Sequence, residues 1–103
     1  GGTMTSLPQK LGKYTLDADN LKLLFEDQVQ SLTKKEAGIL EMLAKTPNQP
    51  VKREDVLVKI WKDDSYFAGR SMDVYITKLR KYLRKDPSVR ILNVHGKGYK
   101  LLA

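Results

Sequence analysis

Apolar side chains recur at a helical spacing between residues 70 and 85. On a helix drawn with about 100° per residue, one narrow arc holds Met72, Ile76, Leu79 and Leu83. That arc predicts a face packed against a core. The opposite arc carries four cations, two small methyl-bearing residues and no acid, namely Arg70, Val74, Thr77, Lys78, Lys81 and Lys85. The pattern therefore predicts a helix over 70–85, ended by Asp86-Pro87, with one face that suits a polyanion.

Three short runs near the start of the chain have the composition and spacing of strands, with Tyr14 and Leu16 on one face of the first and Leu21, Leu23 and Phe25 on one face of the second. They predict strands at 11–16, 21–25 and 28–31, with turns at Asp17-Ala18-Asp19-Asn20 and at Glu26-Asp27. Alternation with a period of two places the apolar side chains on one face of each strand. We therefore expect an antiparallel meander with one buried face.

Two more helices are predicted between these strands and the basic segment. Thr33 and Glu36 have the spacing of a capping box, in which both side chains accept hydrogen bonds from backbone amides at the helix start. That helix ends near residues 47–50, which contain two prolines. A shorter helix is expected over 53–61, and residues 62–69 are expected to form a polar loop that leads into the basic helix.

The last residues of the chain predict a hairpin. Strands at 89–94 and 99–102 flank His95-Gly96-Lys97-Gly98, whose glycines supply the positive φ that a tight turn needs. Because it follows the basic helix, this hairpin would provide a second basic element.

The net positive charge of the 103-residue chain arises in its last third. Residues 1–69 hold ten Lys or Arg and ten Asp or Glu, whereas residues 70–103 hold nine against two, so the net charge of +7 arises there. A block of one sign on one helix and the hairpin after it indicates a nucleic-acid footprint. The plain alternative is a solvated helix face whose charge has no binding role.

Several function classes find no support in the sequence. Cysteine is absent and His95 is the only histidine, so a zinc or iron site would need carboxylates almost alone. Gly96-Lys97-Gly98 lacks the third glycine and the following helix of a dinucleotide loop, and no serine or cysteine motif stands beside His95. No window approaches the roughly 18 apolar residues of a membrane span. We expect a cytoplasmic protein that is not an enzyme and has no cofactor, metal or membrane partner.

The exposed arc also indicates how DNA could be read. An α-helix fits the major groove, where side chains reach base edges, and Val74 and Lys78 lie in the middle of the arc. Phosphate contacts position a protein without specifying sequence. Residues that flank the middle of the arc are better placed for such contacts, and these are Arg70, Ser71, Tyr75, Arg80 and Lys81.

Five motifs occur in an order that is specific in combination. They are Leu32-Thr33-Lys34-Lys35-Glu36, Ile60-Trp61, Arg70-Ser71-Met72-Asp73-Val74-Tyr75-Ile76, Leu79-Arg80-Lys81 and Val94-His95-Gly96-Lys97-Gly98-Tyr99. With them, the whole of Leu11–Leu102 resembles the winged-helix effector domain of OmpR/PhoB-type response regulators, the output half of bacterial two-component systems. The resemblance implies an α+β fold: a winged helix-turn-helix with an N-terminal four-stranded antiparallel sheet, three helices and a C-terminal β-hairpin wing. Residues 11–103 would form this domain, and residues 1–10 would be a cloning scar and an interdomain linker.

The resemblance also implies a binding mode. The recognition helix, residues 70–85, would enter the major groove of double-stranded DNA, and the wing, residues 93–99, would approach the minor groove. Matching positions imply phosphate contacts at Trp61, Arg70, Ser71, Tyr75 and Arg80, base-facing positions at Val74 and Lys78, and wing contacts at Asn93, His95, Lys97 and Tyr99. Implied partners are tandem DNA half-sites, RNA polymerase through loop 62–69, a receiver domain for which these residues leave no room, and its sensor kinase.

Three positions depart from the family pattern. Lys78 stands where arginine is common, which weakens bidentate readout of guanine. His95 replaces a frequent wing arginine, which disfavours insertion of this side chain into the minor groove near neutral pH. Lys52 stands at the usual serine cap of the second helix and offers no side-chain oxygen to the amides there.

Two other binding functions stay open. A winged-helix module could bind a protein, with the basic helix facing an acidic partner. A basic RNA-binding domain would more naturally expose aromatic side chains on a sheet. Steep salt dependence together with a large preference among duplex sequences would separate DNA binding from both.

Overall fold

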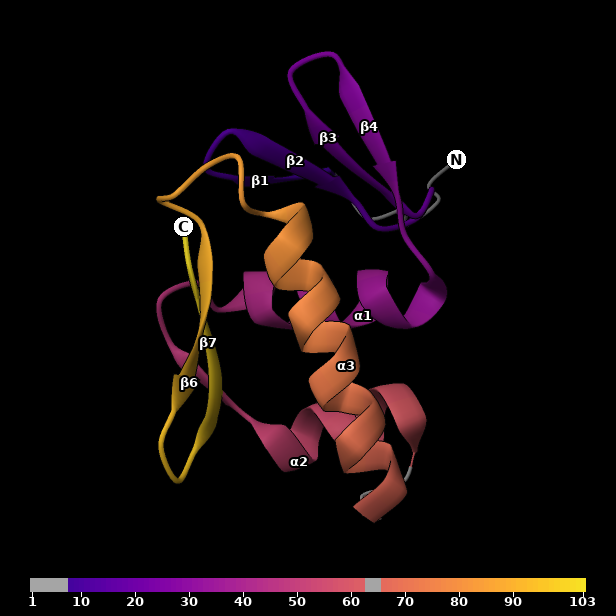
Figure 1. Cartoon of the computed structure of the whole chain (residues 1–103), viewed down its shortest axis with the longest axis vertical. Coiled ribbons are helices and arrows are strands. Elements are labelled where there is room, and N and C mark those ends of the chain that lie inside the picture. Colours follow the sequence, from indigo (N-terminus) through magenta and orange to yellow (C-terminus); the bar gives the residue numbers. More distant parts are fainter. Residues whose placement is uncertain (1–7, 63–65) are drawn as a thin grey trace, which may run out of the picture.

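The described chain begins and ends in antiparallel sheets, and most of its helical residues lie between them in the sequence (Figure 1). The computed structural model describes residues 8–62 and 66–103, with side chains from residue 70 onward in the second range. The elements in chain order are β1 (Gln9–Leu11), β2 (Tyr14–Asp17), β3 (Lys22–Phe25), β4 (Gln28–Ser31), α1 (Lys34–Lys45), β5 (Pro50–Lys52), α2 (Arg53–Val56), the π-helical turn η1 (Leu57–Trp61), α3 (Tyr66–Tyr82), β6 (Arg90–Val94) and β7 (Gly98–Leu102). One sheet has the order β1-β2-β3-β4, and the other has the order β5-β7-β6.

The predicted strand over 11–16 is wrong, because the chain turns in its middle. Gly12 has a φ of +60° and lies between β1 and β2, which pair with each other. The predicted strand rested on the two-residue spacing of Tyr14 and Leu16, and the single glycine before them was not taken as a turn. The sheet therefore has the four strands that the family resemblance implies. β1 begins at Gln9, so the end of the segment 1–10, which we assigned to a linker, belongs to the sheet.

The apolar stripe predicted for the basic helix is the core face of α3. Its four side chains are at most 2% exposed: Met72, Ile76, Leu79 and Leu83. They belong to one buried cluster with residues from α1 and both sheets. Burying an aliphatic side chain of this size contributes about 1.5–3 kcal/mol. The stripe therefore fixes which face of α3 stays outside.

α3 starts earlier than the predicted helix over 70–85. It covers Tyr66–Tyr82, so the last four residues of the predicted loop 62–69 are helical, and residues 63–65 lie outside the described part of the chain. Those four residues contain no proline, and their one glycine costs a helix only about 1 kcal/mol relative to alanine. A loop was therefore not required by the sequence.

α3 also ends three residues before the predicted position. The amides of Arg84 and Asp86 donate to carbonyl groups three residues back, which tightens the chain as at many helix ends. The amide of Lys85 donates instead to the Tyr14 hydroxyl, at 3.0 Å. Contacts with the β1–β4 sheet thus replace the last predicted helical hydrogen bonds.

The predicted capping box of α1 is confirmed. The Thr33 amide donates to Glu36 Oε1 at 2.8 Å, and the Glu36 amide donates to Thr33 Oγ1 at 3.1 Å. The second carboxylate oxygen of Glu36 accepts a hydrogen bond from the Tyr82 hydroxyl at 3.2 Å. Burial, followed by the nearby Glu36 carboxylate, raises the pKa of Tyr82. One side chain therefore caps α1 and ties it to the end of α3.

A buried carboxylate closes the loop after α3. Asp86 is 5% exposed and accepts hydrogen bonds from the Lys13 amide at 2.8 Å, the Ser88 amide at 3.0 Å and the Ser88 hydroxyl at 2.7 Å. These bonds, with the Ser88 hydroxyl first, lower the pKa of Asp86. We call Lys13, Asp86 and Ser88 the Asp86 junction. It joins the β1–β2 turn to the α3–β6 loop.

The predicted helix over 53–61 is helical throughout, although its second half is wound as the π-helical turn η1. Lys52 is its N-cap residue and makes no side-chain capping bond, as predicted. The strand β5 just before it pairs with β7 of the hairpin. The start of α2 is therefore held against the hairpin by backbone pairing.

Candidate nucleic-acid interface

The outward face of α3 carries the arc predicted from the sequence. All of its members are exposed, the last of them just past the helix end: Arg70, Val74, Thr77, Lys78, Lys81 and Lys85. Val74 is 56% exposed, although single exposed apolar residues are common on protein surfaces. A helix of this diameter, about 10–12 Å with side chains, matches the width of the DNA major groove.

The wing lies at the same end of the molecule as the first half of α3. In Figure 1 the turn between β6 and β7 and the start of α3 both project away from the β1–β4 sheet. His95 and Lys97 are exposed in that turn, and Gly96 has a φ of +75°. The start of α3 and the exposed wing turn thus lie at one end of the molecule.

An acid on the flank of α3 joins the helix to the hairpin. Asp73 Oδ1 accepts a hydrogen bond from Arg53 Nη1 at 2.9 Å and from the Tyr99 hydroxyl at 3.0 Å. Arg53 Nη1 also donates to the Tyr99 hydroxyl, at 2.8 Å. The Arg53 guanidinium is the main cause that lowers the pKa of Asp73, whereas burial raises the pKa of Tyr99. We call these three residues the Asp73 bridge.

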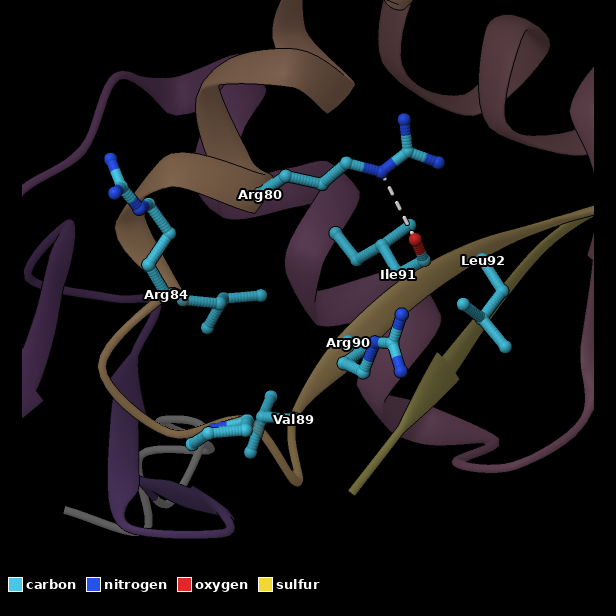
Figure 2. A pocket seen from close by; sticks show the side chains of 8 residues that line it. Arg80, Arg84, Val89, Arg90, Ile91 and Leu92 are labelled. Carbon is cyan, nitrogen blue, oxygen red and sulfur yellow. Dashed lines mark hydrogen bonds between the residues drawn. The ribbon is translucent and has the colours of Figure 1, made fainter.

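A second contact joins the same two elements further along α3. Arg80 Nε donates to the Ile91 carbonyl at 3.0 Å, which Figure 2 shows, and Arg80 Nη2 donates to Asn93 Oδ1 at 2.7 Å. We call Arg80, Ile91 and Asn93 the Arg80 bridge. Both bridges use side chains that the sequence had suggested as DNA contacts.

Tyr99 therefore differs from its expected role as a wing contact. Its side chain is 5% exposed, and its hydroxyl is bonded to Asp73. Residues that pair directly across two strands share a face, and Tyr99 pairs with Asn93. Both side chains point toward α3, where they make the two bridges. Tyr99 therefore links the hairpin to α3, and its contact with DNA stays a prediction.

Trp61 and Tyr75 form the border of the interface at η1. Their rings meet edge to face with centroids 5.5 Å apart, and both side chains are half-buried. The Lys35 ammonium lies 6.0 Å from the Trp61 ring, and the Lys78 ammonium lies 5.8 Å from the Tyr75 ring. These distances are within reach of cation–π attraction. The aromatic pair therefore contacts one cation of the exposed arc, Lys78, and one cation of α1, Lys35.

Sequence reasoning missed two arginines near the hairpin. Arg84 and Arg90 are exposed, and with Arg80 they surround a pocket of about 330 Å³ between the end of α3 and β6 (Figure 2). The base of this pocket includes the buried side chains of Leu83 and Val89. The excess of cations after residue 70 was the one sign of these arginines in the sequence. A helical wheel cannot show that cations from a helix and a strand line the same pocket.

Hydrogen-bond donors and positive charge dominate the chemistry of this interface. Within residues 8–62 and 66–103, no three His, Cys, Asp or Glu side chains come together as a metal site requires. The helices in this part of the chain include none that is long and apolar enough to cross a membrane.

Comparison with known sequences identifies a family. The profile described as "Transcriptional regulatory protein, C terminal" matches residues 27–101. The transcriptional regulatory protein RprY of Bacteroides fragilis is 50% identical over 93 residues, which are 90% of this chain and 39% of that protein. This chain spans about two fifths of the length of the curated relatives it matches.

Solved structures agree with this family. The C-terminal domain of the nisin resistance regulator NsrR, described as a lantibiotic response regulator, matches with a TM-score of 0.71 and 34% identity, over 90% of this chain and 96% of that chain. The DNA-binding domain of Klebsiella pneumoniae RstA, solved in complex with the RstA box, matches with a TM-score of 0.77 and 27% identity, over 94% and 98%. The fold implied by the sequence is confirmed. This chain belongs to the family of C-terminal domains of transcriptional regulatory proteins, as a winged-helix domain of the OmpR/PhoB type.

Proposed function

We propose that this domain binds double-stranded DNA with sequence preference, with α3 in the major groove and the wing near the minor groove. The exposed, acid-free arc of α3 beside an exposed wing is the observation that carries the proposal. The RstA domain, which shares this fold at 27% identity, has been crystallised with its DNA box. That likeness supports the same class of ligand here.

In this proposal, the middle of the arc reads bases. The Val74 side chain ends in methyl groups that can contact a thymine methyl group, and the Lys78 ammonium can donate to guanine acceptors. Phosphates are contacted by exposed residues at the edges of the arc and by the aromatic border, namely Trp61, Arg70, Ser71, Tyr75 and Lys81. The wing contributes Asn93, His95 and Lys97, whereas Arg80 and Tyr99 act mainly through the two bridges.

The longer protein would use this domain as its output. We propose that a receiver domain under a sensor kinase pairs two copies on tandem half-sites, and that residues 62–69 face RNA polymerase. Of that segment, residues 63–65 are outside the described structure. The proposal places the protein in the cytoplasm, and it assigns this domain no catalysis, because the matching family is one of transcriptional regulators.

The competing function is binding of an acidic protein by the same cations. A protein partner would also be attracted by the arc, and that attraction would also weaken with salt. A domain that binds an acidic protein would not, however, discriminate between DNA duplexes of equal length and different sequence. Sequence preference is therefore the property to measure.

The test is fluorescence anisotropy of this chain with a duplex selected from a random pool and with its scrambled counterpart, across a salt series. Log affinity should fall linearly with log salt, with a slope near −0.9 per phosphate neutralised. Lys78→Ala should reduce the preference for the selected duplex by about 1–3 kcal/mol. Lys97→Ala should weaken binding to both duplexes equally and reduce the slope by about one.

Lys10→Ala is the matched control. Lys10 is an exposed cation on β1, in the sheet that lies away from the wing in Figure 1. It changes the net charge as much as the other two variants, and it should change neither preference nor slope by a comparable amount. Equal affinity of wild-type protein for the two duplexes, or equal effects of all three variants, would refute the proposal.

A further inference from the structure

An acid on the DNA-facing side of this domain requires an explanation. Asp73 and Asp86 are the two acids of residues 70–103, and Asp86 is buried in its junction. The Asp73 side chain is 60% exposed and lies on the same helix as the proposed DNA contacts. A carboxylate there repels phosphates, so on charge alone it would weaken the proposed binding.

The stability of the fold does not supply that explanation. Arg53, the ion-pair partner of Asp73, has a side chain that is 38% exposed. Ion pairs between exposed groups typically add only about 0–1 kcal/mol to the stability of a fold. The contact does, however, join three separate segments: the start of α2, the flank of α3 and the central strand β7. The three segments that this contact joins therefore indicate its role better than its contribution to stability does.

The two bridges attach the hairpin to α3 at two levels. Asp73 and Arg80 are seven residues apart, which is about 10.5 Å along a helix axis at 1.5 Å per residue. Their partners Tyr99 and Asn93 are directly paired on neighbouring strands. Two attachments separated along the helix axis restrict rotation of the hairpin against α3 more than one would, in addition to the packing of Ile91 and Leu101 in the core.

We propose that Asp73 and Arg80 are positioning residues that hold the wing at a fixed angle to α3, so that both elements fit one duplex at the same time. This inference rests on the proposed DNA-binding function. Asp73 favours specific binding by pre-organising the wing, although its charge opposes binding. Pre-organisation improves affinity because less motion is lost on association.

Charge and positioning predict opposite results for substitutions of Asp73. Asp73→Ala and Asp73→Asn remove the same charge, but the asparagine amide oxygen can still accept from Arg53 and Tyr99. Alanine accepts nothing, although it is the better helix former. A comparison of the two variants therefore separates the hydrogen bonds from the charge, and poor helix formation cannot explain a loss.

The experiment measures binding of wild type, Asp73→Asn, Asp73→Ala and Tyr99→Phe to the selected and scrambled duplexes. Asp73→Ala should bind the selected duplex roughly three- to tenfold more weakly than Asp73→Asn, which corresponds to the loss of one or two hydrogen bonds. Binding to the scrambled duplex should stay equal or become tighter, because a negative charge is gone. Tyr99→Phe leaves the charge unchanged and should lower affinity for the selected duplex alone.

Arg80→Lys tests the second bridge without changing the charge. A lysine ammonium cannot reproduce the two-pronged contact to the Ile91 carbonyl and Asn93. The variant should lose preference for the selected duplex while the salt slope stays the same. Urea unfolding of every variant shows whether a loss of binding follows from unfolding.

If wild type prefers the selected duplex but both Asp73 variants bind both duplexes more tightly by the same factor, charge alone acts and the inference is wrong. Equal selected-duplex affinities for Asp73→Asn and Asp73→Ala would also overturn it. If wild type shows no preference between duplexes, the proposed function fails, and that result is distinct from either of these.

Discussion

Two aspartates of the basic third of the chain occupy opposite environments. Asp86 is buried at the end of α3 and accepts bonds from a backbone amide of the first sheet and from Ser88. Asp73 is exposed on the flank of α3 and accepts bonds from Arg53 and Tyr99. Both contacts lower the pKa of the carboxyl group, through different kinds of partner.

The difference separates folding from binding along one helix. Toward its end, α3 is surrounded by the Asp86 junction, the Glu36 contact and the β1–β4 sheet, so substitutions there should change stability. Toward its start, the helix also carries exposed side chains and a bridge to the hairpin, so substitutions of those exposed residues should change binding with little effect on stability. Four substitutions or conditions test this division, and the largest effect is expected at the buried end.

Gly12→Ala should cause the largest loss of stability, because it disturbs the buried Asp86 junction. An alanine at φ +60° costs roughly 1–2 kcal/mol, and its Cβ would also press on the Asp86 carboxylate and the Val89 side chain. We expect a loss of about 2–4 kcal/mol in the free energy of unfolding, measured with urea. Gly96→Ala is the control, because φ is also positive there but no atom lies within 4 Å of the added Cβ. Equal losses in both variants would contradict a close fit at Gly12.

Thr33→Ala should cost about 1 kcal/mol of stability, because it removes the hydroxyl that caps α1. Thr77→Ala makes the same chemical change on the exposed arc of α3 and should stay within about 0.5 kcal/mol of wild type. Thermal unfolding of both variants gives the comparison. A larger loss of stability for Thr77→Ala than for Thr33→Ala would contradict the expectation that the exposed arc contributes little to stability.

Acid should weaken the Asp86 junction. A carboxyl group whose pKa is lowered by folding stabilises the protein above its ordinary pKa of about 4, and this contribution disappears as pH falls through the lower folded value. The stability difference between wild type and Asp86→Asn should therefore be greatest near neutral pH and shrink below about pH 4. Urea unfolding at several pH values measures it. A difference that stays constant with pH would show that the charge of Asp86 has no role.

Asp73→Ala should change the free energy of unfolding little, by no more than about 0.5–1 kcal/mol, because the ion pair is exposed. The same variant should lose preference for the selected duplex. A destabilisation comparable with that of Gly12→Ala would place Asp73 with the residues that hold the fold together.

Local patterns in the sequence predicted much of this structure. The capping box at Thr33 and Glu36 depends on two residues three apart, and the core stripe of α3 depends on one helical period, so both could be read directly. The turn at Gly12 and the early start of α3 were missed. Their signals, a single glycine and a stretch without proline, are also compatible with the structures that we predicted instead.

Contacts between distant segments could not be predicted. Arg53, Asp73 and Tyr99 come from three elements, and no periodicity relates them. Position in the family pattern suggested that Arg80 and Tyr99 contact DNA, but only the packing of the hairpin on α3 shows that both side chains are bonded inside the protein. The exposed members of the candidate site, including Val74 and Lys78, lie where the helical wheel placed them.

Mapping the amide chemical shifts of this chain by NMR, as the selected duplex is added, tests whether α3 and the wing form the DNA-binding surface. The largest changes should occur along the exposed arc of α3 and at the wing, with little change in β1–β4. The scrambled duplex should produce smaller changes at Val74 and Lys78. Changes centred on the β1–β4 sheet, or identical changes with both duplexes, would contradict recognition of DNA sequence by α3.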